Sequence, residues 1–470
     1  MAIGVLFVFL SKYVLNYHRI QKGEKALYAQ KIMKKISFLF LFLALVCLLC
    51  SCSGKEADIY FLNFKPEVAS VYDEIARAYE DETGIKLRVT TAASGTYEQT
   101  LKSEISKKEA PTIFQINGPK GYAAWKDYCA DLSDTALYQH LTDKSSAIRD
   151  GDEVYGIPYV VEGYGIIYNK AITDRYFSLQ NRATTVESME NIKNFATLKA
   201  VVEDMTAHKE ELGIDGVFAC TSLKAGEDWR WQTHLANLPV YYEFEKNEID
   251  WTVDEDTDRI DFTFNQNFKN IFDLYIQNST VSPTLLGSYQ VADSMAEFAT
   301  GKCAMVQNGN WAYSQIKEVS GNIVKEEDIA FLPIYTGVEN EETQGLCVGT
   351  ENYLAINKNA SEEQRKKAAD FLYWLFSSET GKKFVTEKLD FIAPFDTFSA
   401  DERVSDPLGR SVSDWMAKEG IKQVPWSFTV FPSANFKEDF GSALLRYCQG
   451  KMTWEQVVAT FKTRWAEEAR

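Results

Sequence analysis

The sequence predicts an α/β protein whose mostly parallel sheets carry helices on both faces. Near the start of the globular region, strand-like and helix-like segments alternate, and this order is typical of parallel sheets flanked by helices. Far downstream, capping boxes at 361–364 and 453–456 begin two amphipathic helices. The 470 residues are 45% hydrophobic, which supplies enough apolar material for two or more domains or one large one.

The first elements can be predicted from the spacing of apolar residues. Residues 59–62 are apolar throughout, whereas apolar and polar residues alternate over 85–89, and both patterns indicate strands. The helix between them keeps its apolar residues on one face, beginning at Pro66 and ending at Gly84. The predicted order is strand 59–62, the helix from Pro66, strand 85–89, a helix around 101–105 and strand 111–116.

The N-terminal region predicts a secreted and lipid-anchored protein. A basic pair precedes an apolar run over 36–49, which is the pattern of a secretory signal. A small residue and Cys52 follow, and this ending resembles the lipobox of bacterial lipoproteins, which implies a lipid on Cys52. We therefore expect 1–51 to be a presequence, with 1–32 as a start-site extension. The alternative is an uncleaved anchor, although the run is shorter than the roughly 20 residues that span a bilayer.

Charge and composition exclude several classes of function. The net charge is −17, and it becomes about −23 without 1–51, because that segment carries seven basic residues and one acidic residue. So acidic a chain argues against nucleic acid or an anionic membrane surface as a partner. After Cys52, the five cysteines lack C-x-x-C spacing and the three histidines of that region lack metal-ligand spacing, so we expect no metal and no cofactor. We expect these cysteines to be buried, with one disulfide as an alternative.

Three segments combine strand-like runs with glycine, asparagine and aromatic residues. Residues 155–170 are β-rich but interrupted by glycine and proline, which suits a strand that crosses between two lobes. Residues 298–311 contain a buried strand that ends in Asn-Gly-Asn-Trp, and 353–394 join a strand, a helix and Ile-Ala-Pro. In their order and spacing, these segments resemble the extracellular solute-binding proteins of ABC importers, in particular the carbohydrate-binding, maltose-type branch.

This resemblance implies a two-lobed, type II periplasmic-binding-protein fold with the ligand cleft between the lobes. Each lobe would be a mostly parallel sheet flanked by helices, and hinge closure would trap the ligand. The resemblance places chain crossings near 160–164, 345–353 and 389–395. The expected N-lobe comprises 55–161 plus 353–392, and the expected C-lobe comprises 163–348 plus 396–470.

Two residues are the strongest candidates for ligand contact. Glu162 lies in the middle of the first crossing, where its carboxylate could accept two sugar hydroxyls. The resemblance supports this role, and a structural salt bridge at the hinge is the alternative. Trp311 follows the carboxyl end of a strand, where ligands of open α/β sheets bind, and the resemblance gives it a sugar-stacking role. The alternative for Trp311 is packing on the following helix.

Further candidates follow predicted strands or lie in aromatic-rich stretches. Amides at strand ends offer both donors and acceptors to a sugar. Trp229 and Trp231 alternate in a segment that we interpret as extended, so the two rings would line one wall or, equally well, form a core pair. The candidates beyond Glu162 and Trp311 are Asn63, Tyr97, Asn117, Tyr164, Trp229, Trp231, Asn308, Asn310, Trp426 and Phe428.

The sequence favours a sugar receptor over two alternatives. A secreted glycoside hydrolase needs two carboxylates at one bond, but no pair stands out and no G-x-S-x-G or H-E-x-x-H motif occurs. A binding protein for peptide, polyamine, phosphate or iron stays open, although Trp311 and the amides favour a neutral polyol. We expect a monomeric receptor without enzymatic activity, held by lipid on Cys52 at the outer face of the cell membrane. Its partners would be a carbohydrate and the permease subunits of an ABC importer.

Overall fold

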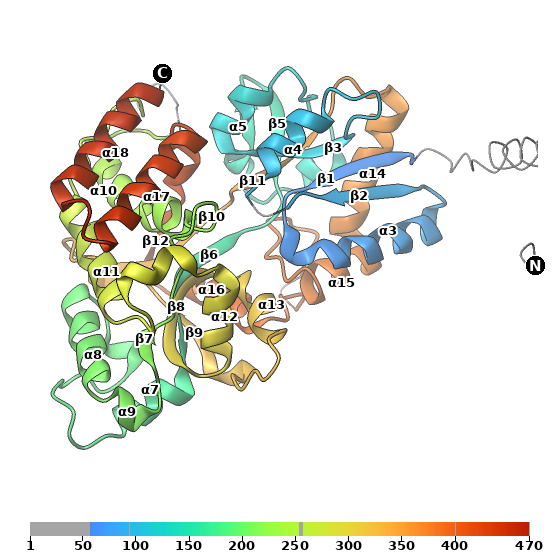
Figure 1. Ribbon diagram of the computed structural model, residues 1–470. Helices are drawn as coiled ribbons and strands as arrows, with labels where there is room; N and C mark the ends of the chain where they lie inside the picture. Colours follow the sequence, from blue (N-terminus) through green and yellow to red (C-terminus); the bar gives the residue numbers. More distant parts are fainter. Residues whose placement is uncertain (1–56, 94, 253–256, 400, 470) are drawn as a thin grey trace, which may run out of the picture. The chain divides into compact units, whose positions relative to one another are not determined.

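Two six-stranded sheets with helices packed on them form the core of the molecule (Figure 1). The α/β fold class predicted from the sequence is confirmed. The computed structural model describes residues 57–93, 95–252, 257–399 and 401–469. The predicted presequence 1–51 and the lipidation site Cys52 lie outside the described residues. Within the described ranges, no helix combines the length and the apolar character needed to cross a membrane.

The first sheet contains the three strands predicted from the early part of the chain. Its order is β2-β1-β3-β11-β5-β4. In it, β1 (Ile59–Asn63) lies between β2 (Leu87–Thr91) and β3 (Ile113–Asn117), and the three strands run parallel. The other strands are β4 (Ile148–Asp150), β5 (Glu153–Pro158) and β11 (Asn352–Ile356).

Helices cover both faces of this sheet, because successive side chains of a strand point to opposite sides. Ile59 packs in a core with α3 (Ala69–Thr83) and α14 (Glu362–Ser377). Leu62 packs on the other face, in a core with α4 (Tyr97–Glu104). The remaining helices on this sheet are η2 (Pro66–Val68), α5 (Gly118–Trp125), α6 (Ala136–Gln139), η3 (Lys144–Ser146) and α15 (Glu379–Glu387).

The expected helix signals are confirmed at Gly84 and at the two capping boxes, whereas Pro66 begins the 3-10 turn η2 and α3 itself begins at Ala69. Gly84 ends α3 with a φ of 71°, a left-handed conformation that glycine adopts without steric cost. The side chains of Ser361 and Thr453 accept hydrogen bonds at the starts of α14 and α18 (Trp454–Glu468), each within a complete capping box. Local sequence chemistry therefore sets these boundaries.

The second sheet has the order β12-β10-β6-β8-β7, with β9 paired to β6. All residues of β6 (Glu162–Asn169) and β8 (Cys303–Gly309) are buried, including the polar Glu162, Asn169, Gln307 and Asn308. Its other strands are β7 (Gly216–Phe218), β9 (Ile329–Leu332), β10 (Gln344–Gly349) and β12 (Lys422–Pro425).

Two groups of helices cover the second sheet. The smaller group packs on the face of Ile167 and Val306 and consists of α12 (Val291–Ala299), α13 (Ala312–Lys317) and α16 (Pro407–Ala417). The larger group packs on the face of Tyr164 and Ile166, where α17 and α18 lie side by side (Figure 1). It consists of α7 (Lys170–Phe177), α8 (Phe195–Ala207), α9 (Lys209–Leu212), α10 (Asn237–Lys246), α11 (Asn265–Gln277), α17 (Ala434–Cys448) and α18.

Both sheets mix strand directions, so the expectation of mostly parallel sheets is corrected. Each sheet has two parallel and three antiparallel pairs of neighbouring strands. The strand–helix–strand units supply parallel pairs such as β1–β2 and β7–β8. All antiparallel pairs except the β4–β5 hairpin involve β6 or β11, the strands that follow two of the connections between the sheets and run against their neighbours.

Three stretches of chain connect the two sheets. Residues 159–161 lead from β5 to β6, and residues 350–351 lead from β10 to β11. At the third connection, the backbone N–H of Val161 donates to the carbonyl of Ile392 at 2.8 Å, and the chain then continues to α16. These stretches overlap the predicted crossings, while the lobe boundaries derived from them stay a prediction.

The cysteines of the described residues are all free and buried, as the sequence favoured. Burial raises the pKa of their thiols above the ordinary value, to about 12 for Cys129, Cys347 and Cys448. The five free thiols are Cys129, Cys220, Cys303, Cys347 and Cys448.

Candidate functional site

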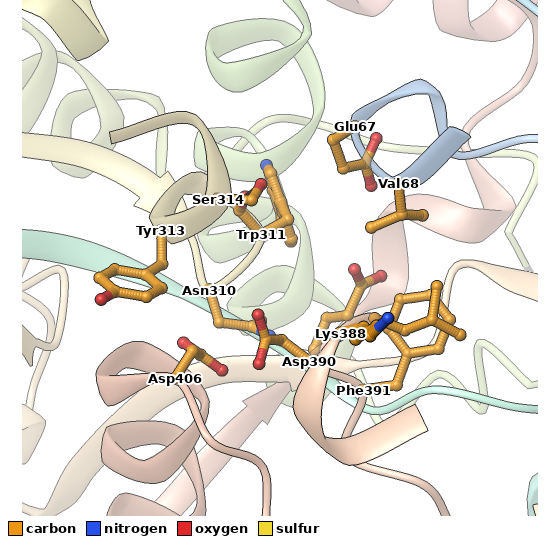
Figure 2. A pocket seen from close by; sticks show the side chains of 12 residues that line it. Glu67, Val68, Asn310, Trp311, Tyr313, Ser314, Lys388, Asp390, Phe391 and Asp406 are labelled. Atoms are coloured by element: carbon orange, nitrogen blue, oxygen red, sulfur yellow. Dashed lines mark hydrogen bonds between the residues drawn. The ribbon is translucent and has the colours of Figure 1, made fainter. Parts of the chain in front are cut away.

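A small cavity lies where the core of the first sheet meets elements of the second sheet. Val68 and Phe391 on its wall belong to the first sheet's core, whereas Trp311 packs against a core of the second sheet. In Figure 2, Glu67 and Val68 from η2 face Trp311 across the cavity. The lining residues are Glu67, Val68, Glu162, Asn310, Trp311, Tyr313, Ser314, Lys388, Leu389, Asp390, Phe391 and Asp406.

The cavity is too small for a sugar. Its volume is about 20 Å³, which is room for about one water molecule. A pyranose ring could enter only after the elements on the two sides had separated. The two sides come from different sheets, so such a separation requires movement at the three connections and leaves each core intact.

Glu162 forms a buried ion pair beside this cavity. The Nζ atom of Lys65 lies 2.6 Å from Oε1 of Glu162 and 3.8 Å from Oε1 of Glu67. Burial opposes the charged form of Lys65, but the two carboxylates outweigh that effect and raise its pKa. Burial also raises the pKa of Glu67, against the influence of Lys65. The salt bridge that the sequence left as an alternative is therefore present, and the same carboxylate of Glu162 lines the cavity.

Most of the predicted aromatic candidates gather around one histidine. His234 lies on η5 (Arg230–Leu235), a π-helical turn, and its ring centroid lies 4.5–5.6 Å from those of five aromatic rings. Trp311 contacts three further members of the group at 5.9–6.2 Å and connects it to the cavity. We call this group the aromatic cluster; it consists of Tyr164, Trp229, His234, Trp311, Trp426 and Phe428.

Glycines let two of these rings lie against the backbone. A Cβ atom on Gly309 would lie 2.1 Å from atoms of the Trp311 ring, and one on Gly349 would lie 2.7 Å from Trp426. Both glycines are in strands of the second sheet. The close seat of Trp311 over β8 therefore depends on the absence of a side chain at Gly309.

The aromatic cluster and the adjoining Arg230 contain buried polar atoms without a partner among the described residues. These atoms are Nε1 of Trp426, Nε2 of His234, and Nε and Nη1 of Arg230. The guanidinium of Arg230 lies 3.8 Å from the ring centroid of Trp229. Burial lowers the pKa of His234 well below its usual value, and the nearby Arg230 charge adds to this effect, so the imidazole is neutral.

The predicted asparagines and Tyr97 are largely engaged by their own fold. Asn310 lines the cavity, but its Oδ1 accepts from the backbone N–H of Gly163 at 2.9 Å. Asn308 is buried and donates to the sulfur of Met295 at 3.6 Å. Each of the other three residues is also hydrogen-bonded: Asn63 Nδ2 donates to the carbonyl of Lys65, Asn117 Nδ2 donates to Oε1 of Glu351, and the Tyr97 hydroxyl accepts from the backbone N–H of Gln115.

The prediction of an extended segment at Trp229 and Trp231 is wrong. Trp231 is in the π-helical turn η5, so the two side chains do not share a face. Trp229 joins the aromatic cluster, whereas Trp231 is 2% exposed, packs on Phe272 and Tyr275, and donates to backbone carbonyls. Two tryptophans separated by a single residue in the chain thus have different surroundings.

Several residues of the site escaped the sequence analysis. His234 and Arg230 gain their positions from η5, which no local pattern had indicated. Lys65 meets Glu162 across 97 positions of the chain, and Glu67 follows it in η2. The available signal was their proximity in sequence to predicted candidates, since Arg230 separates two tryptophans and Lys65 follows the first strand.

The site offers no evident metal centre. Within the part of the chain that the structure describes, no group of three or more His, Cys, Asp or Glu side chains could hold a metal ion. The acidic groups on the cavity wall instead lie near lysines or have a raised pKa. Asp390 lies 3.7 Å from Lys317, and burial together with the Asp390 charge raises the pKa of Asp406 to about 7.

Comparison with known proteins identifies the family. The model of the bacterial extracellular solute-binding proteins matches residues 74–409, well over half of the chain. The chain belongs to this family. Its members are binding proteins, and the family's extracellular placement agrees with the export predicted from the N-terminal region. No curated protein matches this solute-binding protein.

Solved structures share its fold at low sequence identity. The solute-binding protein RafE in complex with raffinose is 16% identical with a TM-score of 0.66, covering 88% of this chain and 99% of its own. A sugar transporter from Bacillus licheniformis in complex with stachyose is 17% identical with a TM-score of 0.62, covering 87% and 100%. Maltose-bound MalE3 of T. maritima is 14% identical with a TM-score of 0.62, covering 87% and 98%. These likenesses confirm the predicted fold class.

Proposed function

We propose that this solute-binding protein captures an oligosaccharide between its two sheets and delivers it to the permease of an ABC importer. One observation carries the proposal: Trp311 connects the cavity between the sheets to a cluster of aromatic rings with buried, unpartnered polar atoms. Aromatic planes suit the C–H faces of sugar rings, and unpartnered donors and acceptors suit hydroxyls. The raffinose, stachyose and maltose bound by proteins of the same fold agree with this ligand class.

Capture would proceed by hinge closure. The first sheet and its helices form an N-lobe of 55–161 plus 353–392, and the second sheet forms a C-lobe of 163–348 plus 396–470. A sugar first stacks on the aromatic cluster of the C-lobe, and contacts from η2 and Glu162 then favour the closed state. The ligand can shift this balance only through its greater affinity for the closed form.

The predicted lipid anchor completes the assignment. A diacyl or triacyl group on Cys52 would hold the monomeric receptor at the outer face of the membrane, since one acyl chain alone anchors only marginally. Closed lobes would then be presented to the permease subunits at short range. Metabolic labelling with a palmitate analogue tests this step: Cys52→Ser should abolish labelling and release the protein from the membrane fraction.

Isothermal titration calorimetry against a panel of ligands tests the proposed function. The panel contains raffinose, stachyose, maltotriose, xylo-oligosaccharides and chito-oligosaccharides, with a tripeptide, spermidine, phosphate and ferric citrate as non-sugar arms. Saturable binding of a saccharide without release of products is the expected outcome. The proposal would be overturned in favour of another solute if only a non-sugar ligand bound tightly. It would be overturned in favour of a hydrolase if a chromogenic glycoside were turned over.

A further inference from the structure

Arg230 is the most unusual charged residue of the described chain. Its side chain is 2% exposed, and Nε and Nη1 have no hydrogen-bond partner within the described residues. A buried charge without a partner costs stability, so proteins rarely keep one unless it has a role. The contrast with Lys65 is direct, because Lys65 is equally buried but contacts two carboxylates.

The surroundings of Arg230 are those of a binding surface. Its guanidinium lies 3.8 Å from the ring centroid of Trp229, which in turn contacts Trp311 at 5.9 Å. The stacked plane of an arginine leaves its edge, with the N–H groups, free to donate in a fork to an oxyanion. Tyr164 bonds only the backbone carbonyl of Arg230 and so does not occupy that edge.

His234 offers an acceptor in the same cluster. The hydroxyl of Thr233 donates to the carbonyl of Trp229, so its oxygen can accept from Nδ1–H of His234, 3.0 Å away. This bond assigns the proton of the neutral imidazole to Nδ1 and leaves Nε2 as an unpartnered acceptor. Nε1 of Trp426, on a ring 5.4 Å from His234, is an unpartnered donor. One acceptor, one neutral donor and one cation are thus grouped around the stacking rings.

We propose that the captured sugar is acidic and that Arg230 binds its carboxylate. This inference rests on the proposed function and narrows its substrate class to uronate-bearing oligosaccharides. The ring of the uronate would stack within the aromatic cluster, with a hydroxyl donating to His234 and another accepting from Trp426. It replaces the neutral polyol that the sequence alone favoured.

The charge count favours a carboxylate over a phosphate. Among the described residues, Arg230 is the only cation that lies over a ring of the cluster, and one guanidinium matches one negative charge; the charges of Lys437 and Lys65 act on His234 without lying over a ring of the cluster. A phosphate ester carries about −1.5 to −2 at neutral pH and would need a further donor cation. The acidic wall of the cavity does not prevent binding, because Lys65 pairs with Glu162 and lies near Glu67, and Lys317 lies near Asp390.

Calorimetry with matched probes tests the inference on the whole protein. The probes are oligosaccharides that contain glucuronate, galacturonate or mannuronate, their methyl esters, their neutral hexose counterparts, and glucose 6-phosphate. We expect a uronate oligosaccharide to bind most tightly, with at least a 30-fold loss on esterification or in the Arg230→Met variant, since truncating one partner of a buried charge pair is costly. Arg230→Lys should lose most of this affinity as well, because it lacks the planar fork.

Two outcomes would overturn the inference in distinguishable ways. If a neutral sugar binds more tightly than any uronate and Arg230→Met leaves its affinity unchanged, the acidic substrate class is wrong while the proposed function stands. If glucose 6-phosphate binds best, the oxyanion is a phosphate and the carboxylate assignment is wrong. If no saccharide binds, both the proposed function and this inference are wrong.

The ligand-free protein gives an independent readout. Because Arg230 is buried with two unpartnered guanidinium nitrogens and is influenced by Glu227 and Glu67 without a direct ion pair, Arg230→Met should leave the melting temperature unchanged or raise it. Methionine keeps a flexible apolar contact with the Trp229 ring. A melting temperature lowered by more than about 5 °C would mean that Arg230 supports the fold, and the assignment of a binding role would fail.

Discussion

The two sides of the cavity differ in how their polar groups are satisfied. On one side, Lys65 and Glu67, which follow β1 of the first sheet, form a buried network with Glu162, the first residue of β6, and the cation contacts both carboxylates. On the side of the second sheet, Trp426 and His234 of the aromatic cluster and the adjoining Arg230 have unpartnered polar atoms. The first side is thus complete without a ligand, whereas the second is not. This difference indicates that recognition belongs to the aromatic cluster and that the lysine network supports closure.

The largest effect should follow from breaking the lysine network. Lys65→Met leaves Glu162 buried without its cation, and we expect a loss of about 3–5 kcal/mol in the free energy of unfolding. Chemical denaturation followed by circular dichroism measures this loss. In the double variant with Glu162→Gln, part of the stability should return because the uncompensated charge is gone.

A matched control for Lys65 is available on the surface. Lys383 pairs with Glu379 at 2.8 Å on α15, where both side chains are exposed, and Lys383→Met should cost no more than about 0.5 kcal/mol. If Lys65→Met is as mild as Lys383→Met, the lysine network does not stabilise the fold, and the contrast between the two sides of the cavity disappears.

The Trp311→Ala variant tests whether the aromatic cluster binds the sugar. Trp311→Ala should weaken sugar binding by about 1–3 kcal/mol, because it removes both the stacking plane and the connection to the cavity. The fold should survive, as judged by circular dichroism. Trp374→Ala, which removes a half-buried ring on α14 outside the cavity, serves as the control and should leave affinity unchanged. Equal losses of affinity in the two variants would show that Trp311 has no specific role in sugar recognition.

The stability of the protein should depend on pH through Asp406, which lines the cavity. Burial and the Asp390 charge raise the pKa of Asp406 to about 7 from 3.8, so the folded state holds its proton more tightly than the unfolded chain does. The stability that this group contributes is complete below pH 3.8 and falls as the pH rises through about 7. Asp406→Asn keeps the oxygen that caps α16 and should be more stable than the parent above pH 7, by about 1–2 kcal/mol. Thermal melts at pH 5 and pH 8 measure this difference, and parallel pH profiles in the two proteins would contradict it.

The smallest effect should come from changing Gly309, the residue of β8 against which the Trp311 ring packs. Gly309→Ala places a Cβ atom where the ring lies, so the ring must shift, and we expect a loss of affinity of about 1 kcal/mol. The loss should vanish in the background of Trp311→Ala, because the two changes act through the same ring. An additive loss in the double variant would show that Gly309 acts by another route.

Features that depend on residues close together in the chain were predicted from the sequence, whereas features that depend on residues far apart in the chain were not. The parallel strands β1, β2 and β3, the end of α3 at Gly84 and the capped starts of α14 and α18 depend on neighbours within a few residues, and all were predicted. The pairing of Lys65 with Glu162 spans 97 positions and no local pattern encodes it.

The candidate site shows the same limit. Trp311 was predicted because it follows the end of a strand, but His234 and Arg230 reach the site through the π-helical turn η5. The alternation of Trp229 and Trp231 suggested a strand, and the helical conformation instead separates the two rings. The mixed direction of the sheets was also missed, since strand direction is set by distant partners across the crossings.

The inert thiols of this protein make its proposed opening directly observable. Because all five cysteines of the described residues are buried with raised pKa values, maleimide dyes should ignore them in the native state. A version that begins after Cys52 could therefore receive one new surface cysteine on α3 and another on α18, each labelled without removing a native residue. Energy transfer between such a dye pair would follow single molecules as they open, fill and close.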